Sequence, residues 1–188
     1  MKVTPQAIPD VLLIEPARHG DARGFFSEVW KRSALAAIGL TAEFVQDNHS
    51  FSRDAGVLRG LHFQRPPHAQ GKLVRVVRGR ILDVVVDIRD GSPTNGRHVT
   101  AELSAANWRQ VWVPRGFAHG FITLEPDTEV LYKVDAEYDR DSDGAIAWND
   151  PALGIDWPLP PGGPILSEKD AKAPRLAEVA PIFPRGSW

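Results

Sequence analysis

Residues 56–79 have the sequence GVLRGLHFQRPPHAQGKLVRVVRG, in which two β-like runs flank a proline-rich loop. Alternation of apolar and polar residues is the pattern expected of strands that build a core. The polar positions, however, carry Arg59, His62, Gln64 and Lys72. We therefore expect these two strands to present charged side chains to the mouth of a barrel.

Short β-like runs recur on both sides of this stretch. A spacing of about ten residues, with turn-forming residues between the runs, is typical of an all-β sandwich or barrel. Gly79 and Arg80 are suited to a tight turn and predict a hairpin between 72–79 and 81–88. The runs are 11–15, 24–30, 42–50, 57–63, 72–79, 81–88, 97–103, 108–114, 120–125 and 129–135.

Helical signals are few and short. Residues 31–39, KRSALAAIG, predict one short helix that ends at Gly39, and residues 162–179 predict one or two helical turns. The part of the chain from about residue 139 is proline-rich and irregular, and we expect it to wrap the barrel. A length of 188 residues suits a single domain, 1–188.

The composition excludes several classes of protein. A formal net charge of −2 favours neither a nucleic acid nor a membrane surface as partner. The sequence has no cysteine, which rules out disulfides and thiolate metal sites. The apolar run near the N-terminus is too short for a signal peptide, and a membrane-spanning helix needs ~20 apolar residues. We expect a cytoplasmic protein with no membrane partner.

The segment VPRGFAHGF, residues 113–121, contains P-x-G-x-x-H and resembles the second half of the cupin signature. Cupins that bind a metal commonly carry H-x-H and a following Glu in the first half. Here that half is His62-Phe63-Gln64, and no Glu occurs before Lys72. Because the ligand set is incomplete and a lysine cation repels a divalent ion, no metal is expected.

Three side chains, those of His62, Lys72 and Tyr132, instead supply the groups needed for proton transfer next to a carbonyl group. The neutral imidazole of His62 can accept a proton near pH 7. Lys72 can stabilise an oxyanion, and the phenol of Tyr132 can return a proton. A base on one face of a ring and an acid on the other would invert the carbon between them.

At this level of detail the chain resembles the dTDP-4-dehydrorhamnose 3,5-epimerase family of deoxysugar-nucleotide epimerases. The resemblance implies a mostly β, antiparallel, cupin-type jelly roll with a few short peripheral helices. It also implies inversion of C3 and C5 of dTDP-4-keto-6-deoxy-D-glucose to give dTDP-4-keto-L-rhamnose, with no cofactor. The matching segments are 21–28, 44–52, 56–64, 70–79, 113–121, 131–138, 146–158 and 166–170.

The resemblance further implies individual roles. His62 is expected to be the general base, oriented by Asp170. Lys72 is expected to face the enolate oxygen, and Tyr132 to be the acid on the opposite face. A homodimer is implied, with active sites completed across the interface. The residues expected to bind the dTDP-sugar are Arg59 and His119 at the diphosphate and sugar, Arg23, Glu28, Gln46 and Asn48 at the thymidine end, Tyr138 stacked on the base, and, with no part of the substrate specified, Asp143 and Lys169.

Two departures from the family pattern are visible. Asp143 stands where the family usually has Glu, and its side chain is one methylene shorter. Phe63 stands where the family often has Tyr, and on a regular strand it should point away from His62. Trp108 and Trp112 share a parity within the run 108–114, and we expect them in the core or an interface.

Arg59 and His62 have opposite parity, so a regular strand would direct them to opposite faces. Both can reach one substrate only if the alternation is interrupted, and Gly60 is the expected place for a bulge. Three alternative functions remain open: an epimerase acting at C3 or C5 only, a metal-dependent cupin oxygenase or isomerase, and a non-catalytic sugar-nucleotide binding module.

Overall fold

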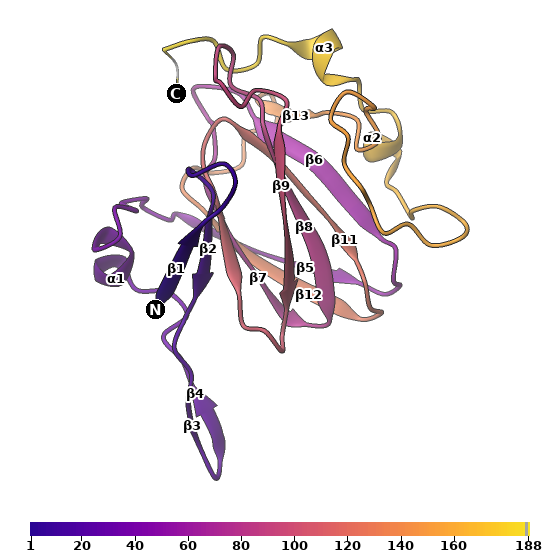
Figure 1. Cartoon of the computed structure of the whole chain (residues 1–188). Coiled ribbons are helices and arrows are strands. Elements are labelled where there is room, and N and C mark those ends of the chain that lie inside the picture. Colours follow the sequence, from indigo (N-terminus) through magenta and orange to yellow (C-terminus); the bar gives the residue numbers. More distant parts are fainter. Residues whose placement is uncertain (187) are drawn as a thin grey trace.

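The computed structural model describes residues 1–186 and 188, and it contains two antiparallel sheets that face each other as a jelly-roll sandwich (Figure 1). The predicted mostly β, antiparallel architecture is confirmed. The six-stranded sheet has the order β1 (Lys2–Pro5), β2 (Leu12–Glu15), β10 (Gln110–Val113), β7 (Lys72–Arg78), β12 (Thr128–Val134) and β5 (Gln46–Ser52). The five-stranded sheet has the order β13 (Asp143–Ala145), β6 (Leu58–Gln64), β11 (Phe117–Thr123), β8 (Arg80–Asp87) and β9 (His98–Ser104).

Three short helices lie outside the sheets, as expected. They are α1 (Arg32–Ala36), α2 (Glu168–Ala171) and α3 (Leu176–Val179). The first is shorter than the predicted 31–39, although the chain does turn away at Gly39, which has a φ of +83°. None of the helices in the described residues is long and apolar enough to cross a membrane.

The core has three clusters in the described residues: one between the sheets, one behind the five-stranded sheet, and one where α1 packs on the outer face of the six-stranded sheet. Alternate side chains of the facing strands, such as Val74, Val85 and Phe117, fill the space between the sheets. Behind the five-stranded sheet, Trp157 and Phe183 belong to the cluster that covers its outer face. Burying an apolar side chain of this size contributes about 1.5–3 kcal/mol, so the irregular C-terminal segment is held to the sheet by packing.

The predicted hairpin at Gly79 is wrong. Strand β7 belongs to the six-stranded sheet and β8 to the five-stranded sheet, so Gly79 is where the chain crosses between layers. Its φ is +75°, and a Cβ at this position would lie 2.2 Å from Oγ1 of Thr128. A glycine is therefore required where the chain passes from one sheet to the other. Because glycine is also favoured in a tight hairpin turn, its presence in the sequence does not distinguish the two connections.

Two further expectations about strands fail. The run 24–30 forms strand only at β4 (Gly24–Phe26), which pairs with β3 (His19–Asp21) in an arm that projects away from the sandwich (Figure 1). Trp108 precedes β10 and has a φ of +61°, so it does not share a strand with Trp112. Its Nε1 donates a hydrogen bond to Oγ of Ser27 at the base of the arm, 3.1 Å away.

The bulge expected at Gly60 is present. In the pairing of β6 with β11, His62 lies opposite His119 and Arg59 opposite Phe121, so Gly60 and Leu61 together face the single residue Gly120. A Cβ on Gly60 would lie 2.5 Å from the Cα of Gly120, and its φ is +136°. The extra residue brings Arg59 and His62 to the same inner face.

The outer-facing residues of β6 follow from the same shift. Leu58, Leu61 and Phe63 are buried in the cluster behind the sheet. Phe63 therefore packs away from His62, as predicted, and its ring would collide with any side chain at Gly144 of β13.

Candidate active site

His62 is held by a buried carboxylate from the C-terminal segment. Its Nε2 lies 2.5 Å from Oδ1 of Asp170, which is 4% exposed. Ser167 caps α2 and donates from Oγ to the other oxygen of Asp170 at 2.8 Å. Burial alone would raise the pKa of Asp170, but the hydrogen bonds from His62 and Ser167 and nearby positive charge hold it below its usual value.

This contact determines which nitrogen of His62 is basic. An ionised carboxylate accepts a hydrogen bond from Nε2–H, so the neutral ring carries its proton on Nε2 and its lone pair on Nδ1. His62 lines a cavity of about 390 Å³ between the sheets. The sequence placed His62 and Asp170 108 residues apart, and the structure brings them into contact as expected.

Lys72 lies at the start of β7 and is 8% exposed. Its Nζ contacts the backbone carbonyl oxygen of His62 at 3.4 Å. Burial lowers the pKa of Lys72 to about 8, while the carboxylates of Asp143 and Asp83 act in the opposite direction and Lys169 lowers it further. The ammonium group therefore stays charged at neutral pH in a site with little water, where it attracts an oxyanion strongly.

Tyr132 enters the same cavity from the opposite layer. It lies on β12 of the six-stranded sheet, whereas His62 lies on β6 of the five-stranded sheet. Burial raises the pKa of Tyr132, and the charge of Arg59 acts against that rise. The phenol therefore remains protonated at neutral pH and is available as an acid.

Other expected substrate-binding residues share this cavity. Arg59 is fixed by Oγ of Ser52 at 3.3 Å and by the carbonyl oxygen of Phe51 at 3.1 Å. His119 is 6% exposed, and its Nε2 lies 2.7 Å from Oδ2 of Asp83. The cavity is lined by Ser50, Val57, Leu58, Arg59, His62, Lys72, His119, Phe121, Tyr132, Ile165, Leu166, Ser167, Lys169 and Asp170.

A second hollow of about 380 Å³ adjoins the first and shares His62, Lys72, Tyr132 and Lys169 with it. Its remaining lining residues include Gln46 and Asn48, which were expected at the thymidine end, Tyr138, which was expected to stack on the base, and Asp143, which was expected to bind the substrate.

These side chains form a connected polar wall. Gln46 donates from Nε2 to Oδ1 of Asn48 at 2.8 Å and accepts from the backbone N–H of Tyr138 at 3.0 Å. Asp143 forms an ion pair with Lys169 and accepts from the Tyr138 hydroxyl at 3.4 Å. The shorter side chain of Asp143 is thus already engaged, with Lys169 as its partner.

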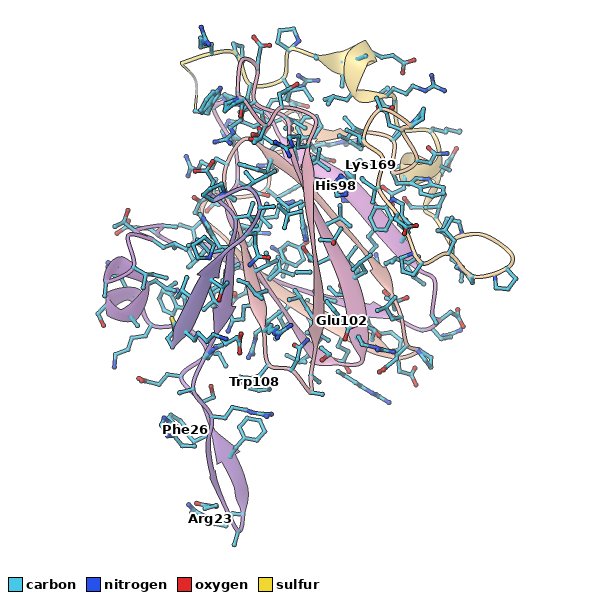
Figure 2. All side chains as sticks on the ribbon, in the orientation of Figure 1. Arg23, Phe26, His98, Glu102, Trp108 and Lys169 are labelled. Carbon is cyan, nitrogen blue, oxygen red and sulfur yellow. The ribbon has the colours of Figure 1, made fainter. Side chains whose placement is uncertain are left out.

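Arg23 and Glu28 are the two expected binding residues that the structure does not bring to the cavity. Arg23 lies at the tip of the arm, where Figure 2 shows it far from the sandwich, and its guanidinium pairs with Asp21 at 2.6 Å. Glu28 lies beyond the arm and pairs with Lys31 at 3.1 Å. Neither residue can reach the cavity of its own chain in this conformation.

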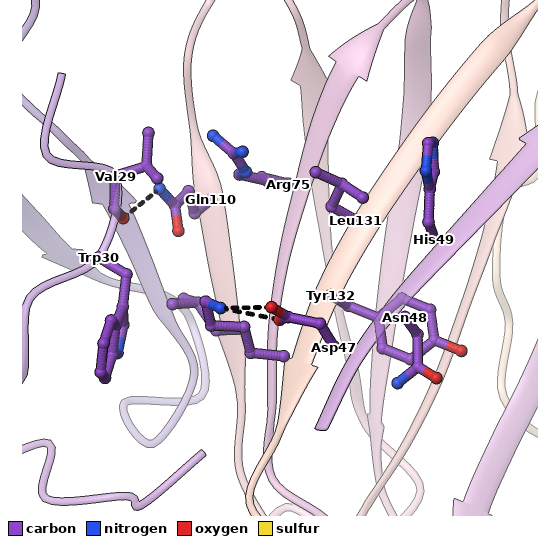
Figure 3. Close-up of a pocket in the computed structure, with 11 residues that line it drawn as sticks. Val29, Trp30, Asp47, Asn48, His49, Arg75, Gln110, Leu131 and Tyr132 are labelled. Atoms are coloured by element: carbon purple, nitrogen blue, oxygen red, sulfur yellow. Dashed lines mark hydrogen bonds and ion pairs between the residues drawn. The ribbon is translucent and has the colours of Figure 1, made fainter. Parts of the chain in front are cut away.

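A further hollow of about 230 Å³ opens on the outer face of the six-stranded sheet (Figure 3). Lys133 and Asp47 form an ion pair across it at 2.8 Å, and Gln110 donates to the carbonyl oxygen of Val29. Val29 and Trp30 follow the arm in sequence, so this face lies next to the arm's base.

Sequence reasoning missed two residues: Ser50, which lines the first cavity, and Asp83, which contacts the lining residue His119. Oγ of Ser50 is buried without a hydrogen-bond partner in the part of the chain that the structure describes, although Ser50 shares its parity on β5 with Gln46 and Asn48. Asp83 interrupts the apolar run ILDVVVDI, and a charged residue inside such a run is the signal that could have identified it.

Metal donors do not cluster in this site. Among residues 1–186 and 188, no group of three or more His, Asp or Glu side chains is placed so that it could hold a metal ion. An imidazole, a buried ammonium group and a phenol around one cavity are the side-chain types of a proton-transfer enzyme.

Comparison with known proteins agrees with that class. The family model for dTDP-4-dehydrorhamnose 3,5-epimerase matches residues 5–178. The chain is 54% identical over 180 residues to the dTDP-4-dehydrorhamnose 3,5-epimerase of Salmonella typhimurium strain LT2, covering 95% of this chain and 97% of that protein. The chain therefore belongs to the dTDP-4-dehydrorhamnose 3,5-epimerase family, and the predicted isomerase activity is confirmed.

Solved structures agree with this assignment. The epimerase of Bacillus anthracis strain Ames, with TDP and PPi bound, is 50% identical with a TM-score of 0.90, covering 93% of this chain and 98% of that one. The dTDP-6-deoxy-D-glucose-3,5-epimerase of Legionella pneumophila Philadelphia 1, in complex with dTDP-4-keto-L-rhamnose, is 45% identical with a TM-score of 0.93. The alignment covers 98% of this chain and 97% of the Legionella chain.

Proposed function

We propose that this chain inverts C3 and C5 of dTDP-4-keto-6-deoxy-D-glucose with His62 as base, Lys72 as oxyanion partner and Tyr132 as acid. The observation that carries the proposal is the placement of the imidazole and the phenol in one cavity on opposite layers, with a buried ammonium group beside them. The ligand of the Legionella relative, dTDP-4-keto-L-rhamnose, is the expected product and supports the same substrate class here.

Each inversion is one proton removal and one proton return. Nδ1 of His62 takes the proton from a carbon next to the C4 ketone, and the electron pair of the broken C–H bond moves to O4. The ammonium group of Lys72 stabilises the resulting enolate. Tyr132 then donates its proton to the opposite face of the carbon, and solvent exchange returns a proton to the phenolate and removes one from His62.

Both C3 and C5 are next to the C4 ketone, so one base and one oxyanion site can serve each carbon after the ring turns. No electrons leave the substrate, so the reaction needs no redox partner. The diphosphate and nucleoside position the sugar through their binding energy. Arg59 and His119 are suited to the diphosphate and sugar, and the polar wall of Gln46, Asn48 and Asp143 to the nucleoside end.

Deuterium incorporation tests the function. In deuterated water, each inverted carbon must take up a solvent deuteron, so NMR of the product should show label at both C3 and C5. Label at one carbon only would make the chain a mono-epimerase. Binding of dTDP without any label would make it a binding module, and loss of activity in EDTA that added metal restores would make it a metal enzyme.

The role of Asp170 has its own test. Asp170→Asn keeps the shape of the side chain but removes the charge that stabilises the imidazolium formed when His62 accepts a proton. We expect the rate of inversion to fall by about tenfold or more, by analogy with the orienting carboxylate of a catalytic triad. Stopped-flow or NMR rates with saturating substrate measure this, and an unchanged rate would remove Asp170 from the mechanism.

The arm supports the expectation of a homodimer. Phe25 and Phe26 are 55% and 68% exposed, which is unusual for two adjacent aromatic side chains, and they lie on a ribbon that projects from the sandwich (Figure 2). Burial against a second copy would cover these rings. It would also carry Arg23 of one chain towards the active site of the other chain. Arg23 does not reach the cavity of its own chain.

Combining an Arg23→Ala chain with a His62→Ala chain in one dimer tests this arrangement. Arg23→Ala and His62→Ala chains, carrying different tags, are co-expressed and the mixed dimer is isolated. If the arm completes the partner's site, the Arg23→Ala chain keeps its own His62 and receives an intact arm, so about half of the activity per dimer returns. If Arg23 serves its own chain, neither site is complete and the mixed dimer shows only the activity of the Arg23→Ala variant.

A further inference from the structure

Asp83 is a buried carboxylate at the edge of the active site to which the mechanism above gives no role. It lies on β8 and is 1% exposed. One of its oxygens, Oδ2, lies 2.7 Å from Nε2 of His119. The other, Oδ1, is buried and has no hydrogen-bond partner among residues 1–186 and 188. A buried carboxylate with a free oxygen is costly, so this negative charge must be offset by something nearby.

Lys72 is a buried positive charge near Asp83 that forms no ion pair within the described residues. Its only polar contact in the described residues is the carbonyl oxygen of His62 at 3.4 Å. In the part of the chain that the structure describes, no carboxylate contacts its ammonium group, although burial disfavours the charged form more than any other influence on it. Asp143 and Asp83 are the two carboxylates whose charge raises the pKa of Lys72 against that burial.

The charged and titratable groups around Lys72 show why Asp83 matters. The three carboxylates of the active-site region are Asp83, Asp143 and Asp170. Asp170 is hydrogen-bonded to His62 and Ser167, and Asp143 is paired with Lys169. Asp83 is the one whose neighbour, His119, leaves an oxygen free. The groups around Lys72 are Arg59, His62, Asp83, His119, Tyr132, Tyr138, Asp143, Lys169 and Asp170.

We propose that Asp83 is a positioning residue of this active site, which supplies the buried negative charge that balances the ammonium group of Lys72 while it fixes the ring of His119. The inference rests on the proposed function, because Lys72 is taken to stabilise the enolate. A counter-charge behind the site, rather than in contact with Nζ, leaves the ammonium group free to turn towards the substrate oxygen. It is thereby charged before the substrate arrives, and no reorganisation is needed during the reaction.

The pH dependence of Asp83→Asn tests the proposal. The amide keeps the shape and a hydrogen-bond acceptor, but it removes the charge. Since the charge of Asp83 raises the pKa of Lys72, its loss should move that pKa below about 8. A shift of about one unit would lower kcat roughly tenfold at pH 9 and little at pH 6. A merely structural role would lower kcat by the same factor at every pH.

The titration of Lys72 can also be followed without substrate. In protein labelled with ¹³C at lysine Cε, the signal of Lys72 is identified by its loss in Lys72→Arg. Asp83→Asn should move its midpoint to lower pH. Asp150→Asn is a matched control, because Asp150 is a 4% exposed carboxylate that does not line either cavity. An unmoved Lys72 midpoint in Asp83→Asn would overturn the proposal, even if the wild type proved to lack epimerase activity.

A stability cycle keeps the proposal testable if Asp83→Asn folds poorly. Lys72→Met should leave Asp83 as an uncompensated buried charge, so adding Asp83→Asn to it should cost much less stability than Asp83→Asn costs in the wild type. Urea denaturation of the variants measures this coupling. Equal losses in both backgrounds, or a double variant that fails to fold where Lys72→Met folds, would show that the two charges are independent.

Discussion

Replacing His62 by alanine is expected to abolish exchange of the C3 and C5 hydrogens with solvent. The imidazole of His62 is oriented by the buried carboxylate of Asp170, and removing a positioned base costs about 10²–10⁴ in rate. Binding of dTDP should change by no more than several-fold, because the base faces the sugar carbon and not the nucleotide. Deuterium uptake by NMR and calorimetric titration with dTDP measure the two effects separately.

His68→Ala is the matched control for this variant. His68 is an exposed histidine in the loop between β6 and β7 and lines neither cavity. Exchange in His68→Ala should equal that of the wild type. If His62→Ala retains exchange at the rate of the control, the base is another residue and the proposed mechanism is wrong.

Replacing Tyr132 by phenylalanine should separate proton removal from inversion. The hydroxyl group has no hydrogen-bond partner in the described residues, so its loss leaves no buried group unsatisfied and the fold should remain stable. His62 can still remove the proton, and washing-out of the C–H hydrogens should continue. Inversion lacks its acid and should slow by about 10²-fold or more.

The product distribution decides the role of Tyr132. NMR in deuterated water should show substrate that has gained deuterium but kept its configuration, or a product inverted at a single carbon. A residue that only packs in the cavity would slow exchange and inversion by the same factor. Inversion of both carbons at the wild-type rate would assign the acid role to water or to another side chain.

Local pattern was sufficient to predict the sheet class and the side chains at the centre of the cavity. His62, Lys72 and Tyr132 are polar residues at inward positions of apolar strands, where a polar side chain needs a reason. The same rule applied to Asp83 would have found it, but the run that contains it was interpreted only as a strand. The conflict between the parities of Arg59 and His62 correctly located the bulge at Gly60.

What the sequence could not supply is the pairing of distant segments. Gly79 permits a hairpin and a crossing equally well, and only the packing of both apolar strand faces in one core selects the crossing. The sequence also did not predict the projecting arm formed by β3 and β4. Its two exposed phenylalanines have the pattern of a strand that covers a core. Both errors concern which layer an element joins, which long-range contacts determine.

The anchoring of the C-terminal segment has a consequence for how the enzyme loses activity. Asp170 reaches His62 from a segment that is joined to the start of β6, where Ile165 exchanges backbone hydrogen bonds with Gly56 and Leu58. Segments held by a few such bonds open at a lower free energy than a sheet core. Partial opening would therefore disconnect the base while the sandwich stays folded. In mild urea, hydrogen exchange at the backbone N–H of Ile165 should therefore increase together with the loss of activity, while Val85 is still protected. Simultaneous exchange at both residues would mean that the segment and the sandwich unfold together.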